Sequence, residues 1–292
     1  MIRLLHRLPS PPVLCESHLR EIHAPSTRLG PISALVPAAD PFLCRDSHAP
    51  ALVLVPGMGM DGLGFLRQLP LGAVSQLHLY QTPNHVAPGE RGIEAFAGVL
   101  EEYVRSTGLE EHPGGLILGG CSMGGAISLA AAIRGKIRIK GLLLIGSFGT
   151  SKHLQFHQLW GAPLAWIAPH SLLRKFAPHA IARTGVFGQV TADEAKWLAT
   201  TKLPRNNAYY GRAAAALTRM DQIPNAKKVS VPTLVLHGTH DRVLPYKAGQ
   251  ELAAVIPMAR LVTFQEAGHA LFFTHPDEVN TAIAEFVTTL RS

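Results

Sequence analysis

From residue 51 onward, short apolar runs alternate with stretches of helical hydrophobic spacing. The runs are rich in Leu, Ile and Val, which is typical of strands buried within a parallel sheet. Between the second and third runs, apolar residues recur at the spacing of one helix face. These patterns predict an α/β fold with a mostly parallel central sheet flanked by helices. The predicted strands are 51–55, 76–80, 115–119, 141–146, 233–238 and 260–264, and the helix face comprises Ile93, Phe96, Ala97, Leu100, Tyr103 and Val104.

The alternation stops between residues 150 and 226, where the sequence is rich in Ala, Trp and Pro and has helical but no strand patterns. We interpret this segment as a helical cap inserted between core strands. The core is therefore predicted to comprise residues 31–149 and 227–292. Residues 1–30 are predicted to form an irregular amino-terminal segment.

One serine lies where a predicted strand meets a predicted helix. In GLILGGCSMGGAISLAAAI, Ser122 is the centre of a Gly-x-Ser-x-Gly motif. A serine on so sharp a turn has a strained backbone, and small neighbours let strand and helix approach each other. The turn also puts the backbone N–H of Met123 at a helix start, which favours negative charge. The motif predicts a nucleophilic serine with Met123 as an oxyanion donor; the alternative is a glycine-rich turn whose serine only caps the helix.

A serine hydroxyl needs a histidine to accept its proton and an acid to orient that histidine. Asp241 follows the predicted strand 233–238, and His269 follows the predicted strand 260–264. Because parallel strands end at the same edge of a sheet, side chains that follow different strands can converge there. The chain order Ser, Asp, His also matches one architecture of serine hydrolases. We therefore predict a catalytic triad of Ser122, Asp241 and His269.

Four stretches of residues 31–292 resemble the α/β-hydrolase superfamily, namely VPGMGMDG, GGCSMGG, VPTLVLHGTHDRVLP and EAGHALFFTHPDEV. The resemblance implies an α/β-hydrolase fold with a cap over the serine. It also implies a second oxyanion donor in the loop after strand 51–55, which here is the backbone N–H of Met58. Pro56 stands where the family commonly has a histidine. The cap placement and the ending GHALFFTHP are similar to those of pimeloyl-acyl-carrier-protein methyl ester esterases and related small carboxylesterases.

Two other stretches of the sequence match parts of known binding-site patterns. Residues 57–62 match Gly-x-Gly-x-x-Gly, but dinucleotide binding also requires an acidic residue at the end of the next strand. That strand is followed by QTPNH, which contains no acid. His237 and His240 flank a turn beside Asp241, yet no further ligands at a recognised metal-site spacing accompany them. We therefore expect neither a cofactor nor a metal.

The formal net charge is +7, and most of it falls within the predicted cap. Residues 150–226 contain nine Lys or Arg against three Asp or Glu, a difference of +6. A basic cap would attract an acidic acyl carrier protein, although solvated helix faces explain these charges equally well. No nucleic-acid-binding motif accompanies them, so no nucleic-acid partner is expected. Large side chains of the cap either line an apolar acyl pocket or form the cap's own core, namely Trp160, Trp166, Phe176, Phe187, Trp197, Tyr209 and Tyr210.

Cysteine usage and hydropathy indicate the compartment. Cys15, Cys44 and Cys121 are widely spaced and include no Cys-x-x-Cys pair, which favours a reducing environment. Prolines interrupt the first apolar run before it reaches signal-peptide length. No apolar stretch is long enough to span a bilayer. We expect a soluble, cytoplasmic protein without a transmembrane segment.

Together, these features predict a serine carboxylesterase that cleaves a small-molecule ester of an apolar acyl group through an acyl-enzyme intermediate. The same scaffold also serves C–C bond hydrolases, thioesterases and acyltransferases, and a ligand receptor with slow turnover could keep the same pocket. The sequence leaves these alternatives open. Ser122 disfavours an epoxide or haloalkane hydrolase, because those enzymes use a carboxylate nucleophile.

Overall fold

A computed structural model of the chain describes most of the predicted core and parts of the predicted cap. The described residues are 18–24, 32–38, 42–84, 90–154, 190–195 and 207–291, with the single residues 40, 86 and 179. Most of the large side chains predicted to line the cap lie outside these residues. Tyr209 and Tyr210 are the two that are described.

Within the described residues, the centre of the fold is an eight-stranded sheet of order β1-β2-β4-β3-β5-β6-β7-β8. The six strands from β3 to β8 are parallel, whereas β2 is antiparallel to both of its neighbours. The parallel strands therefore end at one shared edge of the sheet. The strands are β1 (Leu19–Ala24), β2 (Ile32–Pro37), β3 (Ala51–Val55), β4 (Gln76–Gln81), β5 (Leu116–Cys121), β6 (Gly141–Ile145), β7 (Thr233–Gly238) and β8 (Ala259–Phe264).

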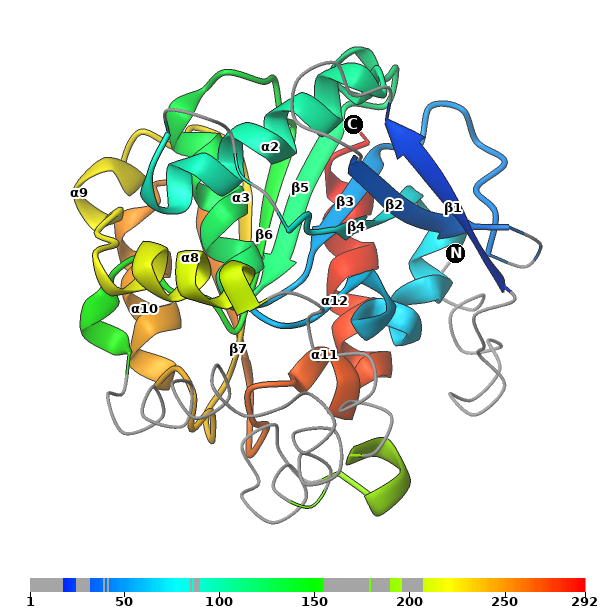
Figure 1. Cartoon of the computed structure of the whole chain (residues 1–292). Coiled ribbons are helices and arrows are strands. Elements are labelled where there is room, and N and C mark those ends of the chain that lie inside the picture. Colours follow the sequence, from blue (N-terminus) through cyan, green and yellow to red (C-terminus); the bar gives the residue numbers. More distant parts are fainter. Residues whose placement is uncertain are drawn as a thin grey trace.

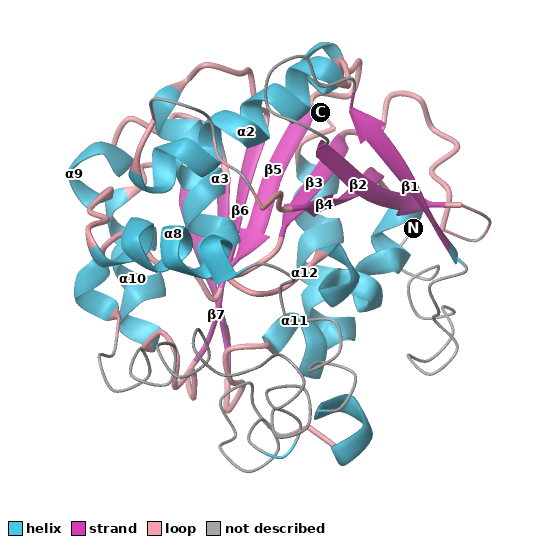
Figure 2. Cartoon of the chain, viewed as in Figure 1, coloured by secondary structure: helices cyan, strands magenta, loops and turns pink. Residues whose placement is uncertain are grey.

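Helices cover both faces of this sheet (Figures 1 and 2). One face carries α2 (Gly92–Ser106), α3 (Met123–Arg134), α8 (Asn207–Thr218), α9 (Ile223–Ala226) and α10 (Tyr246–Val255). The other face carries the helical segment η3 (Gly62–Ala73) with α11 (Leu271–Thr274) and α12 (Pro276–Thr289). Two short turns of helix, η4 (Leu109–Glu111) and η5 (Ser151–His153), are also present. This three-layer arrangement confirms the predicted fold class.

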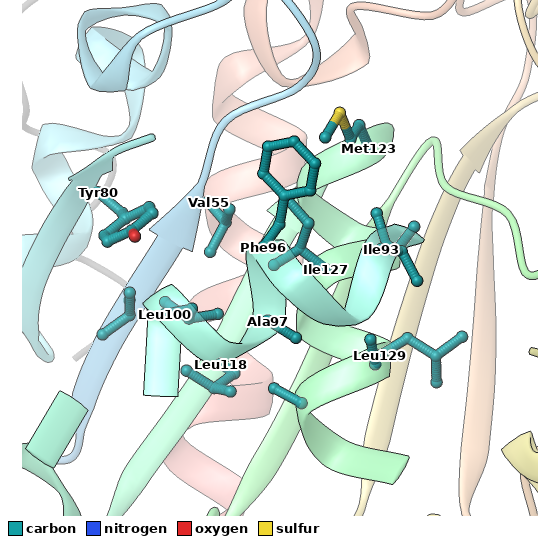
Figure 3. Close-up of a cluster of buried hydrophobic side chains, with 14 of the residues drawn as sticks. Val55, Tyr80, Ile93, Phe96, Ala97, Leu100, Leu118, Met123, Ile127 and Leu129 are labelled. Atoms are coloured by element: carbon teal, nitrogen blue, oxygen red, sulfur yellow. The ribbon is translucent and has the colours of Figure 1, made fainter. Parts of the chain in front are cut away.

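Each face of the sheet buries its own apolar cluster. On the α2 and α3 face, Figure 3 shows Val55 and Leu118 from the strands beneath Phe96 of α2 and Ile127 of α3. All six residues of the predicted helix face are at most 4% exposed. The 3.6-residue spacing of the sequence therefore identified the buried side of α2 correctly. Removing this area from water is the main favourable contribution to folding.

All six predicted strands are present, with boundaries shifted by at most two residues. Strand β5 extends to Cys121, so Ser122 follows it directly. The prediction of irregular structure for residues 1–30 is wrong at residues 19–24, which form the edge strand β1. An edge strand is half solvated, and Arg20 and Glu21 are exposed. The hydrophobic signal that marks a central strand is therefore weak in β1.

The described parts of the predicted cap contact the core at several points. Helix α8 packs beside α2 and contributes Ala213, Ala216 and Leu217 to the buried cluster on that face. Thr150 and Asp221 form an isolated antiparallel bridge. The backbone N–H of Ser151 donates to the carbonyl of Met220 at 2.8 Å. The chain thus leaves the core after β6 and returns to it alongside the point where it left.

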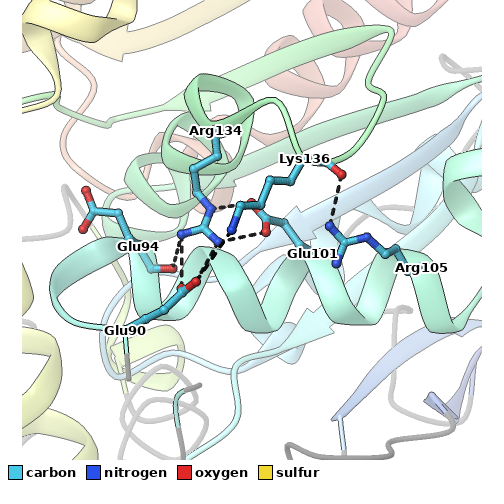
Figure 4. Close-up of polar contacts among 6 residues, drawn as sticks. All are labelled: Glu90, Glu94, Glu101, Arg105, Arg134 and Lys136. Atoms are coloured by element: carbon cyan, nitrogen blue, oxygen red, sulfur yellow. Dashed lines mark hydrogen bonds and ion pairs between the residues drawn. The ribbon is translucent and has the colours of Figure 1, made fainter. Parts of the chain in front are cut away.

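A buried ion-pair network joins α2 to α3 (Figure 4). Arg134 donates from Nε to Oε1 of Glu101 at 2.7 Å and from Nη2 to Oε2 at 3.1 Å. It also donates to Glu90 at 2.9 Å and to the carbonyl of Glu94 at 3.3 Å. The Glu101 side chain is 2% exposed. Its carboxylate therefore depends on the guanidinium for the charge compensation that water would otherwise supply.

Replacing Arg134 with Met is expected to lower the free energy of unfolding by about 3 kcal/mol, because the Glu101 carboxylate would be left buried without a partner. Urea unfolding followed by circular dichroism measures the change. The double variant R134M/E101M should recover part of the loss, since it removes both charges. A double variant that is no more stable than R134M would contradict this account.

Candidate active site

Ser122 lies on the turn that joins β5 to α3, with φ 53° and ψ −122°. A residue other than glycine rarely adopts a positive φ, and such a conformation costs on the order of 1–3 kcal/mol. It persists only where surrounding structure imposes it. Every residue of β5 is buried, as is most of α3. The packing of these two elements therefore holds the serine in its strained conformation.

The two glycines of the motif are steric requirements of this turn. A Cβ atom on Gly124 would collide with the carbonyl oxygen of Val55, at the end of β3. A Cβ atom on Gly120 would lie 2.6 Å from the same oxygen and 2.5 Å from the carbonyl carbon of Gly124. Side chains at either position would push α3 away from the sheet. The steric argument made from the sequence agrees with this packing.

Backbone hydrogen bonds attach the serine turn to strand β6 and the segment that follows it. The Ser122 N–H donates to the carbonyl of Ile145 at 2.9 Å. The hydroxyl of Ser147 donates to the Ser122 carbonyl, also at 2.9 Å. That carbonyl also accepts the first helical bond of α3, from Ala126 at 3.2 Å. Ser122 thus has a defined position at the edge where the parallel strands end.

Asp241 follows β7 and is held from both of its carboxylate oxygens. Oδ1 accepts hydrogen bonds from the backbone N–H groups of Val243 at 2.8 Å and Leu244 at 2.9 Å. Oδ2 accepts a hydrogen bond from Nδ1 of His269 at 2.8 Å. The Asp241 side chain is fully buried, at 0% exposure. The carboxylate therefore has one orientation, and it faces the imidazole.

His269 lies in the loop between β8 and α11. That loop is tied to the one after β7, because the His240 N–H donates to the carbonyl of Ala267 at 3.0 Å. A carboxylate can only accept a hydrogen bond, so the bond to Asp241 fixes the His269 tautomer with its proton on Nδ1. Nε2 is then the basic nitrogen of the ring. Two loops from neighbouring strands thus produce an oriented imidazole.

The surroundings of Asp241 keep its carboxyl group ionised. Burial alone would raise the pKa of Asp241. The charge of His269 and hydrogen bonds from His237 and His269 act in the opposite direction and hold the pKa well below its ordinary value. Asp241 therefore carries a negative charge at any pH near neutrality, as the partner of an imidazolium must.

Gly146 relates the serine turn to the Asp–His pair. It follows Ile145, the residue whose carbonyl accepts from Ser122. A Cβ atom built on Gly146 would lie 3.3 Å from the His269 carbonyl oxygen and 3.5 Å from Oδ2 of Asp241. The absence of a side chain at Gly146 therefore lets the His269 loop approach the end of β6. The three predicted residues all lie around this one end of the sheet.

The predicted oxyanion donors lie on segments that border the serine. Met58 follows Gly57, and a Cβ atom on Gly57 would lie 3.3 Å from Cβ of Ser122. A hydrogen bond of 3.1 Å from the Met60 N–H to the Gly57 carbonyl closes this loop into a tight turn. Met123 is the first residue of α3, so its N–H has no acceptor within the helix. Both N–H groups thus belong to segments next to Ser122.

The first described residues of α8 reach the same loop. The buried hydroxyl of Tyr209 forms a hydrogen bond with the backbone of Gly59, and its ring lies edge-on to Phe96 with centroids 6.1 Å apart. Burial holds the pKa of Tyr209 above its ordinary value, and the bond from Gly59 opposes part of that rise. Tyr209 is therefore a neutral phenol that joins the predicted cap to the Met58 loop.

A second link joins the predicted cap to α11, the helix that follows the His269 loop. Arg67 of η3 donates to Glu194 at 2.6 Å and also to the carbonyl of Phe273. Its guanidinium lies 3.8 Å above the ring centre of Phe273. Glu194 also accepts from the backbone N–H of Thr191 at 2.8 Å. The guanidinium and this backbone hydrogen bond lower the pKa of Glu194, against the effect of partial burial.

The rival sites take other roles in the fold. The Gly-rich loop 57–62 leads into η3, where Asp61 caps the first turn by accepting from Leu63 at 3.0 Å. His237, considered as a metal ligand, is instead buried with its Nε2 atom 3.4 Å from Oδ2 of Asp241. Among the described residues, no three His, Cys, Asp or Glu side chains are grouped to hold a metal ion. In the same residues, no helix combines the length and hydrophobicity needed to cross a membrane.

The contact between His237 and Asp241 was not predicted from the sequence. A signal existed, because His237 is the polar residue at the end of an otherwise apolar strand, four positions before Asp241. The hydroxyl of Ser147, which supports the serine turn, was also missed. It follows β6 within a run of small residues and carries no motif of its own.

Residues 52–282 match the sequence profile described as the alpha/beta hydrolase family. The chain is 27% identical over 255 residues to pimeloyl-[acyl-carrier protein] methyl ester esterase of Aromatoleum aromaticum, covering 82% of this chain and 99% of that protein. Its fold is similar to that of a thermophilic esterase from Thermogutta terrifontis, with a TM-score of 0.72 and 21% identity, covering 94% of this chain and 99% of that one.

A further relative is much longer than this chain. Polyketide synthase ThaQ of Burkholderia thailandensis is 29% identical over 271 residues, which are 86% of this chain but 12% of the synthase. The match therefore concerns one segment of that protein.

Proposed function

The chain belongs to the alpha/beta hydrolase family, and from that premise we propose that it is a serine hydrolase acting on carboxylic esters. The proposed substrate has a small apolar acyl group, and the proposed catalytic residues are Ser122, His269 and Asp241. Met58 and Met123 supply the oxyanion donors through their backbone N–H groups. The reaction proceeds through an acyl-enzyme intermediate and uses no cofactor.

The observation that carries this proposal is the 2.8 Å hydrogen bond between Asp241 and His269, in loops beside a serine with φ 53°. A histidine with a purely structural role would explain the bond to Asp241. It would not explain why a serine on a nearby turn adopts a strained backbone conformation. Backbone strain of this kind clusters at functional sites, because it exposes a reactive group in one orientation. The conjunction therefore supports nucleophilic catalysis over a helix cap.

The proposed first half-reaction forms the acyl-enzyme. Nε2 of His269 removes the proton from Oγ of Ser122 as that oxygen attacks the ester carbonyl carbon. The carbonyl oxygen becomes an oxyanion, which the N–H groups of Met58 and Met123 stabilise. Asp241 stabilises the imidazolium through the bond to Nδ1. Collapse of the tetrahedral intermediate breaks the ester bond, and His269 gives its proton to the departing alkoxide, which leaves as the alcohol.

The second half-reaction returns the enzyme to its starting state. His269 takes a proton from water, and the resulting hydroxide oxygen attacks the acyl carbon. The second tetrahedral intermediate uses the same oxyanion donors. Its collapse breaks the bond to Oγ of Ser122, which recovers the proton from His269 and releases the carboxylic acid. One water molecule is consumed for each ester cleaved.

We also propose that the acyl group is presented by an acidic acyl carrier protein. The relative from Aromatoleum aromaticum is named for such a carrier-linked methyl ester. In this chain, residues 150–226 carry nine basic against three acidic side chains. Complementary charge raises the rate at which two proteins meet and favours one orientation of docking. Arg219, exposed just after α8, is one of the basic side chains in the described part of the cap.

A panel of substrates tests both parts of this proposal. Aryl esters of graded acyl length should be hydrolysed best with short or medium apolar chains. A methyl ester on a carrier protein should show KM about tenfold below that of the same free methyl ester. This advantage should shrink as salt rises from 50 to about 500 mM, because ions screen the steering charges. Steady-state kinetics measure both effects.

Arg219→Glu should reduce the carrier advantage while leaving hydrolysis of the free ester unchanged. The matched control is Arg138→Glu, since Arg138 is exposed before β6, at the opposite end of the strand from Ser122. Equal KM values for free and carrier-linked esters would remove the carrier protein from the proposal and leave the esterase. Rapid labelling of Ser122 by a fluorophosphonate without turnover of any ester would instead favour a ligand receptor.

A further inference from the structure

His237 is a buried histidine that the proposed reaction does not use. It belongs to β7, and its side chain is 0% exposed. Its Nε2 atom lies 3.0 Å from the carbonyl oxygen of Leu244 and 3.4 Å from Oδ2 of Asp241. Its other nitrogen, Nδ1, has no hydrogen-bond partner among the described residues. A buried imidazole with this arrangement calls for a physical explanation, because burying an unpaired polar atom costs free energy.

The contacts of Nε2 determine where the proton of His237 resides. A carbonyl oxygen and a carboxylate oxygen can only accept hydrogen bonds, so Nε2 must carry the proton. One N–H group is thus shared between the Leu244 carbonyl and Oδ2 of Asp241, with the shorter contact to Leu244. Three-centre hydrogen bonds of this kind are common in proteins. The remaining nitrogen, Nδ1, takes no part in these contacts.

The surroundings of Nδ1 offer it no hydrogen-bond partner among the described residues. A Cβ atom built on Gly249 of α10 would lie 2.6 Å from Nδ1, so the helix backbone closes this side of the ring. Tyr246 lies against the ring, with centroids 6.0 Å apart, and donates or accepts through its hydroxyl with Thr263 instead. A second proton on Nδ1 would have no acceptor among the described residues. The titratable groups facing this site are thus Asp241, Tyr246 and, across Asp241, His269.

The Nε2–H group of His237 therefore holds the loop after β7 at two points. Oδ1 of Asp241 accepts from the N–H groups of Val243 and Leu244, which closes the turn locally. The N–H of His237 then binds the Leu244 carbonyl and the second carboxylate oxygen. Without the His237 donor, Oδ2 of Asp241 would still bind His269, but the carboxylate could rotate as the loop moves. Oδ2 would also present more negative charge to the His269 imidazole.

We propose that His237 is a positioning residue, which holds Asp241 so that the carboxylate orients His269 and which limits the charge that Asp241 directs at that imidazole. This inference rests on the proposed function and deepens it. His237 touches neither substrate nor the reacting atoms in this account. It acts through Asp241 alone, as a hydrogen-bond donor rather than as a metal ligand or a proton carrier.

Two substitutions of His237 separate positioning from packing. His237→Met removes the donor while filling a similar apolar volume, and His237→Gln places an amide N–H as many bonds from Cα as Nε2. H237M should lower kcat/KM on an aryl ester by about tenfold. The acid limb of its pH profile should move to higher pH, because a more negative Asp241 stabilises protonated His269. H237Q should restore both kcat/KM and the position of the acid limb toward wild type.

The outcomes distinguish this inference from the function on which it rests. If Ser122→Ala retains turnover, the serine-hydrolase proposal fails whatever His237 does. If Ser122→Ala is inactive while H237M has the wild-type rate and pH profile, the positioning role is wrong. Equal losses in H237M and H237Q, with no shift of the acid limb, would also overturn it, because they would indicate packing alone.

A measurement on the wild-type protein keeps the inference testable if H237M does not fold. Nitrogen-15 spectra of histidine-labelled protein report which ring nitrogen carries the proton. We expect the imidazole of His237 to carry a proton on Nε2, the nitrogen that contacts the Leu244 carbonyl and Oδ2 of Asp241. If the signal that disappears in H237Q, and so belongs to position 237, shows a proton on Nδ1 and none on Nε2, His237 is not the donor proposed.

Discussion

Replacing Ser122 with Ala is expected to lower kcat for ester hydrolysis on the order of 10⁵-fold, since no acyl-enzyme can form without Oγ. The fold should be retained, because Ala and Ser meet the same cost at φ 53°. The backbone bonds from Ser122 to Ile145 and from Ser147 do not involve the lost hydroxyl. Initial rates on an aryl ester, compared at matched thermal midpoint, measure the effect.

The Ser122 experiment needs a control for traces of other esterases. Fluorophosphonate labelling should modify the wild-type protein at Ser122 and leave Ser122→Ala unlabelled. Ser147→Ala is the matched control, since its hydroxyl supports the turn from a neighbouring segment but is not the proposed nucleophile. Ser147→Ala should still be labelled. Wild-type turnover in a fully purified Ser122→Ala protein would reject the nucleophile and the mechanism with it.

Replacing Asp241 with Asn should lower kcat by about 10³- to 10⁴-fold, through the tautomer of His269. Oδ1 accepts from two backbone N–H groups, so the amide oxygen of Asn is expected to occupy that position. The amide NH₂ would then face Nδ1 of His269, where Oδ2 lies 2.8 Å away in the wild type. A donor there favours the tautomer with its proton on Nε2, which cannot accept the proton of Ser122.

The matched control is Asp277→Asn, in the exposed first turn of α12, which should keep wild-type activity. The effect of Asp241 on stability has a defined sign. Its pKa is lowered on folding, so its favourable contribution is full above the ordinary carboxyl pKa and is lost as pH falls through the lowered value. Denaturation of wild type and Asp241→Asn should therefore converge in strongly acidic buffer. Wild-type kcat in Asp241→Asn would show that His269 does not depend on this carboxylate.

The central strands β3, β5, β6 and β7 could be predicted because all their residues are buried, and such strands are rich in Leu, Ile and Val. Strand β1 could not, because an edge strand tolerates exposed residues such as Arg20 and Glu21. The serine turn was predictable for a local reason. A side chain at either of its glycines would clash with atoms a few residues away or on the neighbouring strand. The meeting of Asp241 and His269 followed from their common place after parallel strands.

Other parts of the candidate site depend on distances that no sequence pattern encodes. His237 meets Asp241 because of how the turn 241–244 folds back on β7. Arg67 meets Glu194 and Phe273 across separate elements, and any Arg and Glu in the sequence would have been equal candidates. The Arg134 and Glu101 pair is hidden for the same reason, since an amphipathic pattern marks the buried face but not which charges compensate each other. Long-range polar contacts of this kind require the structure.

The bridge between Thr150 and Asp221 has an evolutionary consequence. The segments that leave and re-enter the core run antiparallel at this point. Backbone hydrogen bonds join them, from the Ser151 N–H to Met220 at 2.8 Å and from the Gln222 N–H to Gly149 at 2.7 Å. The two ends of the predicted cap are therefore fixed next to each other. We expect insertions or deletions within the predicted cap to alter neither the pairing of β6 with β7 nor the spacing of Ser122, Asp241 and His269. The entropic cost of closing a longer inserted segment grows only slowly with its length. Selection can therefore change the predicted cap, and with it the substrate preference that we propose, while the proposed catalytic residues keep their arrangement.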